Sequence, residues 1–483
     1  MKKIKVIIIY LIVLMLIMSM TIVFASFSET MSISGEAKVM PYAKIRIKKV
    51  VFDNSTGSGY ETYNADFNIN KATMYSSLPN NGDSVTYKIV FQNDYSDDYY
   101  ISNVEVISNN NESINVTYNN CETNLLLKAN SETTGYITFN ESNNNSSQDI
   151  IYSIKYTFKK KEYVLLANYV MNLAKLGNTN SLEEIGNTGL AYDGTSDNNL
   201  RYIGSNPNNY ITFNNQTWRI IGVFNNIDDG TGNKETRVKI ISTSRINYLA
   251  WDMNSSGTAL YTNDWTTSNV KTILNDYYLN SSTGTGYYYQ NSTRKSHSFD
   301  FSDNGLNNVK DYIGNTVWGI TGPSERAVTT SDFYNQERNG TVIPSNSNNS
   351  SPSKSWTGKI GLLYPSDYGF ATSGGNTTNR SACLNYYISN STSASKNTDW
   401  RGYSDCYEND YLYHSDYYNW SMTPYAIDDT RVFLFYIAAN TGFLVPAQTY
   451  SGYGVYPTLY LKSNVLYLGG SGSNSDPYKI GLK

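Results

Sequence analysis

The chain has 483 residues and a formal net charge of −4. It is therefore long enough for roughly two or three domains, and it has no basic surplus of the kind that nucleic-acid-binding proteins carry. Only 16% of its residues are charged, against about 25% in an average soluble domain. Asn, Ser, Thr and 45 tyrosines make up the difference. Tyrosine is common both in strands and at wet binding surfaces, so the composition fits β-structure, a binding protein or both.

Residues 1–26 have the pattern of a secretory signal. Three lysines lie within the first five residues, an unbroken apolar run covers 6–18, and Ala25 is a plausible last residue before cleavage. An uncleaved anchor is the alternative, because 6–24 could nearly span a bilayer of about 30 Å. In either case we expect a secreted or cell-surface protein that contacts a membrane only through this segment.

Residues 27–160 are predicted to form an all-β domain. Apolar and basic residues alternate over 43–48, and alternation returns over 85–91 after a turn signal at 81–83. Further short apolar runs, separated by Asn, Ser and Asp clusters, lie at 100–107, 113–118, 125–127, 136–139 and 150–158. Short strands at this spacing, with no helix among them, predict an immunoglobulin-like β-sandwich.

Residues 161–483 are predicted to form a second, α+β domain. Apolar residues recur at helical spacing over 162–176, just before Gly177, and a second helix is expected over 268–279 with Ser268 as its N-cap. Between and after these helices the sequence predicts a hairpin and later strands at 217–224, 237–242, 359–364, 420–422, 431–437, 442–445 and 455–461. Long loops rich in Asn, Ser and Pro, such as 341–355, connect them.

The three cysteines fit an exported protein. Cys383 and Cys406 lie 23 positions apart in one Tyr- and Ser-rich segment, and export permits a disulfide between them. Cys121 is left over, and we interpret it as a buried thiol, with an intermolecular link as the alternative.

No combination of residues predicts catalysis. His297 and His414 each lie alone in a polar loop, where an ordinary solvated histidine is the default. Several carboxylates in a loop-rich region could serve a glycosidase, but the sequence does not fix their separation. They are Asp367, Asp399, Asp405, Glu408 and Asp410.

Calcium is the one metal that the sequence suggests. Asp300 and Asp303 alternate with other oxygen-bearing residues ahead of Gly305, as ligands do in calcium loops. The run 228–233 has a weaker version of the pattern. Ordinary hairpin and loop turns are the competing explanation for both runs, and no other cofactor is expected.

An aromatic run in the second domain is the candidate ligand-binding surface. Exposed aromatic rings could stack on a sugar, and the neighbouring amide and carboxylate groups could hydrogen-bond to it. The proposed residues are Tyr411, Tyr413, Tyr417, Tyr418 and Trp420. A second aromatic cluster lies at 287–289. The alternative is that half of each cluster belongs to the core.

Several segments of both predicted domains resemble segments of one group of bacterial surface proteins. Residues 32–37 and 43–47 resemble the start of many uncharacterised surface proteins of low-GC bacteria. The second domain is similar to the uncharacterised domain that those proteins often carry. The matching segments are 200–204, 218–224, 359–369 and 456–461.

That domain in turn resembles the formylglycine-generating-enzyme fold, a variant of the C-type-lectin-like fold. The resemblance implies a scaffold with long loops, and it does not transfer the activity. The enzymes use a closely spaced redox-active cysteine pair, whereas Cys383 and Cys406 are far apart and fit a structural disulfide better. The arginine expected near the last strand is also absent from 455–457.

The sequence therefore predicts an exported, non-enzymatic interaction protein. Its second domain would bind a glycan or protein ligand through aromatic loops. One alternative is an enzyme, a hydrolase or an oxidase, working through the region 383–410. Another is a matrix or fibre subunit that assembles through exposed edge strands of the first domain.

Overall fold

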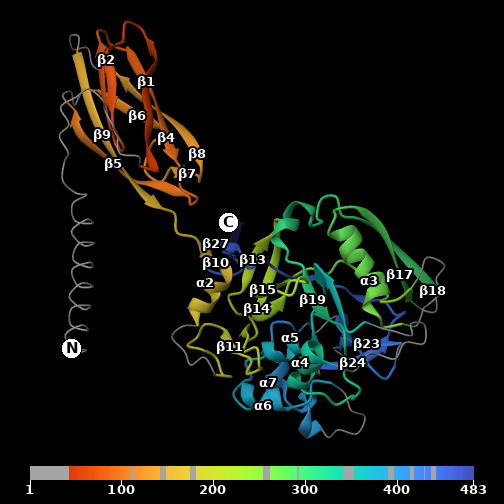
Figure 1. Ribbon diagram of the computed structural model, residues 1–483. Helices are drawn as coiled ribbons and strands as arrows, with labels where there is room; N and C mark the ends of the chain where they lie inside the picture. Colours follow the sequence, from red (N-terminus) through yellow and green to blue (C-terminus); the bar gives the residue numbers. More distant parts are fainter. Residues whose placement is uncertain are drawn as a thin grey trace, which may run out of the picture. The chain divides into compact units, whose positions relative to one another are not determined.

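The chain divides into two compact units, Met1–Glu162 and Tyr163–Lys483 (Figure 1). The computed structural model describes residues 43–109, 114–141, 148–174, 181–253, 262–290, 293–340, 353–389, 396–413, 418–428, 430–436 and 442–483. The signal expected at 1–26 lies outside these residues. Within the described ranges, no helix is both long enough and apolar enough to cross a membrane.

Two antiparallel sheets make up the described part of unit 1. The first has the order β1 (Ile45–Thr56), β4 (Ser84–Asn93), β8 (Ser131–Asn140), β6 (Asn115–Asn119). The second has the order β2 (Tyr60–Phe67), β3 (Lys71–Leu78), β9 (Gln148–Lys160), β5 (Tyr99–Asn109), β7 (Leu126–Leu127).

One apolar core joins the two sheets of unit 1. Tyr87 and Phe139 from the first sheet pack edge-to-face with each other, and Phe139 also contacts Tyr152 from the second. All three rings are buried, as alternating positions on facing strands should be. The predicted β-sandwich is therefore confirmed. Strands β2 and β3 were not expected, because their apolar residues are sparse and the period-two pattern is weak.

A seven-stranded sheet is the largest in unit 2. Its order is β11 (Leu190–Tyr192), β12 (Leu200–Tyr202), β14 (Gln216–Asp228), β15 (Lys234–Ser242), β26 (Thr458–Tyr460), β21 (Ile360–Gly361), with β13 (Tyr210–Phe213) paired to β14. The hairpin β14–β15 confirms the strands predicted at 217–224 and 237–242, and it runs further at its turn.

Smaller sheets complete unit 2. A five-stranded sheet has the order β16 (Tyr248–Leu249), β25 (Tyr453–Gly454), β22 (Asn419–Pro424), β23 (Arg431–Tyr436), β24 (Phe443–Gln448). A three-stranded sheet joins β10 (Val164–Leu165), β27 (Val465–Gly469) and β28 (Lys479–Leu482). Two hairpins are β17 (Thr283–Gln290) with β18 (Thr293–Asp300), and β19 (Thr316–Gly319) with β20 (Ser355–Gly358).

The α-helices of the described residues are all short. They are α2 (Leu166–Leu173), α3 (Asn269–Thr272), α4 (Thr330–Asn339), α5 (Pro365–Ala371), α6 (Arg380–Asn385) and α7 (Ser404–Glu408). Helix α3 continues as a π-helix, Ile273–Tyr278, and 3₁₀ turns lie at Trp265–Thr267, Asn307–Tyr312, Lys396–Thr398 and Trp400–Gly402.

Both predicted helices are present, with changed limits. The first begins at Leu166 rather than near 162, because Val164 and Leu165 pair with β27 instead. The second has Ser268 as its N-cap, as predicted, since the Ser268 side chain accepts the N–H of Lys271.

The core of unit 2 combines tryptophans with buried charges. Six tryptophans are almost completely buried: Trp218, Trp251, Trp265, Trp318, Trp400 and Trp420. Among them lies Asp367, which is 1% exposed and contacts Arg201 at 2.7 Å and Lys239 at 2.5 Å. These two cations hold the pKa of Asp367 below its ordinary value, although burial opposes them.

Candidate functional site

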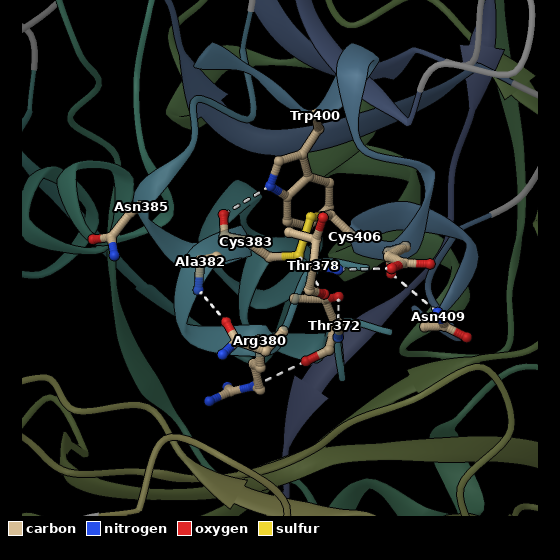
Figure 2. Close-up of a disulfide and its surroundings, with 12 residues drawn as sticks. Thr372, Thr378, Arg380, Ala382, Cys383, Asn385, Trp400, Cys406 and Asn409 are labelled. Carbon is tan, nitrogen blue, oxygen red and sulfur yellow. Dashed lines mark hydrogen bonds between the residues drawn. A yellow bond between two sulfur atoms is a disulfide. The ribbon is translucent and has the colours of Figure 1, made fainter. Parts of the chain in front are cut away.

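The predicted disulfide is present and lies in the interior. Cys383 of α6 and Cys406 of α7 are bonded, with Cα atoms 5.4 Å apart, and neither is exposed. Figure 2 shows Trp400 beside them, with its Nε1–H donating to the Cys383 carbonyl at 2.9 Å. The pair therefore holds two short helices together. Cys121, in unit 1, is a buried free thiol whose pKa burial raises to about 11.

The predicted aromatic run does not form one surface. Trp420 is 2% exposed, and its indole donates to the Leu249 carbonyl while its ring packs on Trp251. The assignment of Trp420 to a ligand surface is therefore wrong: the ring belongs to the core, because β22 is buried along its whole length.

The other members of the run have separate environments. Tyr413 is half-buried and packs on Tyr407, and Tyr418 is 38% exposed. Tyr417 lies outside the described residues. Tyr411 is buried and lines a pocket.

This hollow, the arginine pocket, lies on one face of strands β13, β14 and β15. It has a volume of about 370 Å³. Register places Tyr210, Arg219 and Ile241 side by side on this face, while Trp218 of β14 is buried in the core. The full lining is Tyr210, Thr217, Arg219, Ile241, Ser242, Thr243, Tyr411, Leu412 and Asn474.

Arg219 is the charged group of the pocket. Its guanidinium carbon lies 4.3 Å from the ring centroid of Tyr210 and 4.4 Å from that of Tyr411. Nε donates to Asn209 at 2.7 Å, and Nη2 donates to the Pro207 carbonyl at 3.2 Å. In the described part of the chain, no carboxylate lies within ion-pair distance of Arg219, and Nη1 has no hydrogen-bond partner. The side chain is thus fixed in place while its charge remains uncompensated.

Asp410 is a nearby carboxyl, but it is a poor counter-charge. It is 3% exposed, and its Oδ2 has no hydrogen-bond partner among the described residues. Burial raises the pKa of Asp410 well above its ordinary value of 3.8, and the charges of Arg219 and Arg380 offset this only in part. Burial also lowers the pKa of Arg219 from 12.5, which leaves a guanidinium charged at neutral pH.

No protein-family model, curated protein or solved structure matches this chain. The residues of the site are therefore the evidence for its function.

A second hollow, the polar pocket, shares a wall with the first. Its volume is about 300 Å³, and Asn206 is part of its lining. The Asn206 side chain accepts hydrogen bonds from the Tyr210 hydroxyl at 3.1 Å and from Arg219 Nη2 at 3.4 Å. The full lining is Glu184, Asn187, Thr188, Gly189, Ile203, Gly204, Ser205, Asn206, Pro207, Asn208 and Ser373.

The two aspartates predicted to bind calcium lie in an exposed turn at the end of β18. Asp300 Oδ1 accepts the N–H of Ser302, which is the usual role of an aspartate in such a turn. That hydrogen bond lowers the pKa of Asp300. Over the ranges that the structure describes, no group of three or more His, Cys, Asp or Glu side chains could hold a metal ion. Calcium at Asp300 and Asp303 stays a prediction.

The groups considered for catalysis are engaged elsewhere. The ring of His297 stacks on Tyr288 with centroids 5.0 Å apart, and burial lowers its pKa. Asp399 pairs with Arg401 at 2.5 Å. Asp405 accepts the N–H of Thr377 at 2.7 Å. His414 lies outside the described residues.

Arg219 was missed by sequence reasoning, although a signal was present. In the run 217–221, Trp218 is the residue most certain to be buried, so alternation places Arg219 on the opposite face of the strand. An arginine inside a predicted apolar strand is unusual enough to single out. Nothing in the sequence, however, shows that Tyr411 packs against it from a loop almost two hundred positions away.

Proposed function

We propose that this protein is an exported binding protein whose second unit holds a glycan or protein ligand in the arginine pocket. The observation that carries the proposal is Arg219. It is fixed by two tyrosine rings and by hydrogen bonds, yet no carboxylate among the described residues lies within ion-pair distance of it, and it lines a hollow of about 370 Å³. A pre-positioned charge with free donors is what a binding site for a polar ligand requires.

Binding fits this site better than catalysis does. A nucleophile or a general base would have to lie beside the pocket, with a second group to orient it. The described lining instead offers hydroxyl, amide and phenol groups next to one guanidinium. These groups recognise a ligand through hydrogen bonds and stacking, and none is paired with a base that would activate it.

The finer fold assignments are part of the proposal. Two packed antiparallel sheets support an immunoglobulin-like first unit. For the second unit we propose a C-type-lectin-like scaffold related to the formylglycine-generating enzymes. Its short helices, small sheets and long connections support this assignment, as does the pairing of its first strand, β10, with β27 near its end.

The extracytoplasmic location rests on two features. The first is the pattern of a secretory signal over 1–26. The second is the disulfide Cys383–Cys406, since such bonds persist mainly in oxidising compartments.

A ligand screen tests the binding role directly. The purified protein would be applied to arrays of glycans and of extracellular proteins, in parallel with the variant Arg219→Gln. We expect at least one ligand that binds the natural protein and is lost with the variant. Retention of every ligand by Arg219→Gln would place binding elsewhere, and an absence of any ligand would contradict the proposal.

A matrix subunit is the second candidate, and strand β2 favours it. β2 forms an edge of its sheet and exposes Tyr60 by 52% and Tyr63 by 73%. An edge with exposed aromatic side chains can pair with a second chain. Sedimentation over a range of concentrations would reveal such assembly, and Tyr63→Lys should abolish it by placing a charge on the edge.

A further inference from the structure

We infer that the arginine pocket takes the carboxylate-bearing sugar of an acidic oligosaccharide, and that the polar pocket takes a neighbouring neutral sugar. This inference rests on the proposed binding function and names the ligand class for the same site. Three features support it: the charge of Arg219, the lining of the first pocket, and the wall that the two pockets share.

The first step is the charge of Arg219. Stacking of a guanidinium on aromatic rings leaves its N–H edge as the part that can meet a ligand. Nε already donates to Asn209, so the Nη1 side remains for an incoming group. Nη2 is engaged as well, by the Pro207 carbonyl and by Asn206, so the N–H groups of Nη1 are the ones that can donate charge-assisted hydrogen bonds to a carboxylate. An anionic group would also supply the counter-charge that the described chain does not.

The second step is the lining of the arginine pocket. Beside Arg219 it presents hydroxyl and amide groups from Thr217, Ser242, Thr243 and Asn474. These groups suit a ligand with many hydroxyls, and the Tyr210 ring adds a surface on which a sugar ring can stack. An apolar anchor residue of a peptide would need an apolar pocket, whereas Ile241 and Leu412 are the only aliphatic side chains in this lining.

The third step is the shared wall. Asn206 lines the polar pocket and also hydrogen-bonds to Arg219 and Tyr210 of the first pocket. A ligand longer than one sugar can therefore contact both hollows across this residue. The polar pocket includes Glu184 and no basic residue in its lining. Glu184 would repel a carboxylate on the neighbouring sugar, so the sugar in the polar pocket should be neutral.

The test compares glycans that differ in one charge. The whole purified protein would be titrated calorimetrically with oligosaccharides containing alternating uronic acid and neutral sugars, with their carboxyl-reduced neutral forms, and with acidic peptides. We expect binding to the uronate oligosaccharide to be at least about tenfold tighter than to its neutral form, as for the loss of a charge-assisted hydrogen bond. The affinity should fall as salt concentration rises.

Variants locate the contact. Arg219→Gln should lose at least about tenfold in affinity for the uronate form. Arg294→Gln is the matched control: it removes the same charge from an exposed arginine that also lies over a tyrosine ring, at 5.5 Å, in the β17–β18 hairpin. It should leave binding unchanged. If Arg219→Gln does not fold, Asn474→Trp provides a second variant, since it fills the arginine pocket from an exposed turn.

The outcomes separate the ligand class from the binding function. Equal affinity for acidic and neutral glycans, lost in Arg219→Gln, would overturn the acidic-sugar inference and leave the binding role intact. Binding of acidic peptides alone would replace the carbohydrate by a protein ligand. If the affinity for uronate oligosaccharides does not depend on their length, and Asn206→Ala leaves that affinity unaltered, the two-pocket arrangement is overturned. No binding of any probe would overturn the inference alone, because the screen of glycans and extracellular proteins decides the proposed function separately.

Discussion

Arg201 Nη1 lies 2.7 Å from Asp367 Oδ1, although 166 positions separate the two residues in the chain. Both side chains are 1% exposed. Arg201 also contacts Asp193 at 3.0 Å, and Lys239 contacts the second oxygen of Asp367. The pair thus joins β12 to α5 inside the core of unit 2, where an unbalanced charge would be costly.

The first prediction is that Asp367→Asn strongly destabilises unit 2. The variant leaves Arg201 with one of its two carboxylate partners and removes the carboxylate that pairs with Lys239 in a desolvated site. Removing one partner of a buried pair typically costs about 3–5 kcal/mol. Urea unfolding, followed by tryptophan fluorescence, measures this directly, because every tryptophan of the chain lies in unit 2.

Asp428→Asn is the control for that measurement. Asp428 pairs with Arg431 at 3.0 Å, and both side chains are about one-third exposed. An exposed pair contributes about 0–1 kcal/mol. If the two variants lowered the free energy of unfolding equally, the buried network would have no special role.

The second prediction concerns pH and Glu337. This side chain is fully buried next to Ser366 and Thr423, and burial raises its pKa from 4.5 to about 7. Between these values the native protein keeps a proton that the unfolded chain releases. The free energy of unfolding should therefore fall as pH rises from about 4.5 to 7, by up to about 1.4 kcal/mol per pH unit from this group.

Glu337→Gln should remove this contribution. The amide keeps the shape and can still hydrogen-bond to Ser366. Asp252, whose pKa burial raises to about 6, acts in the same direction, while His297, whose pKa is lowered, acts in the opposite one. The difference in the free energy of unfolding between the natural protein and the variant isolates the contribution of Glu337, because the other titrating groups contribute equally to both proteins. A difference that stays constant from pH 4.5 to 7.5 would show that Glu337 ionises normally in the folded state.

Several strands could be predicted from sequence because apolar and polar residues alternate along them. Strand β4 alternates over most of its length and was expected near its observed limits, whereas β14 was expected from a continuous apolar run and extends beyond the predicted end at 224. Helix α4 was missed because it has too few apolar residues to show a helical period, and α5 was missed because it has only seven residues. Their local signals were nevertheless present: Thr329 and Asp332 form a capping box at α4, and Pro365 begins α5.

The candidate site was predictable only in part. Tyr411 was selected because it belongs to an aromatic run, and it does line the arginine pocket. Trp420 was not distinguishable from an exposed aromatic residue, because composition does not show which aromatic residues are buried. The contact between Tyr411 and Arg219 was not predictable, since it depends on how a distant loop folds back onto β14.

The third prediction concerns the cysteines. Without a reductant, the native protein should show no thiol that reacts with an alkylating reagent, because Cys121 is buried and burial raises its pKa to about 11. After denaturation, one thiol should react, and mass spectrometry should assign it to Cys121. Three reactive thiols in the denatured protein would show that Cys383 and Cys406 are not bonded.

Removal of the disulfide should destabilise unit 2. For a loop closed over a separation of 23 residues, the chain-entropy model gives about 3 kcal/mol. The double variant Cys383→Ser, Cys406→Ser tests this by urea unfolding. Cys121→Ser is the comparison, because it alters a buried thiol of unit 1 and should not shift the fluorescence transition of unit 2.

The last prediction separates two members of the aromatic run. Trp420→Ala should lower the free energy of unfolding by about 3–5 kcal/mol, as expected when a large buried ring leaves a cavity. Tyr418 is 38% exposed, so Tyr418→Ala should cost less than about 1 kcal/mol. Neither residue lines the arginine pocket. A folded Tyr418→Ala protein should therefore bind the uronate oligosaccharide with unchanged affinity, and a loss of binding in this variant would extend the ligand surface to Tyr418, which directly precedes β22.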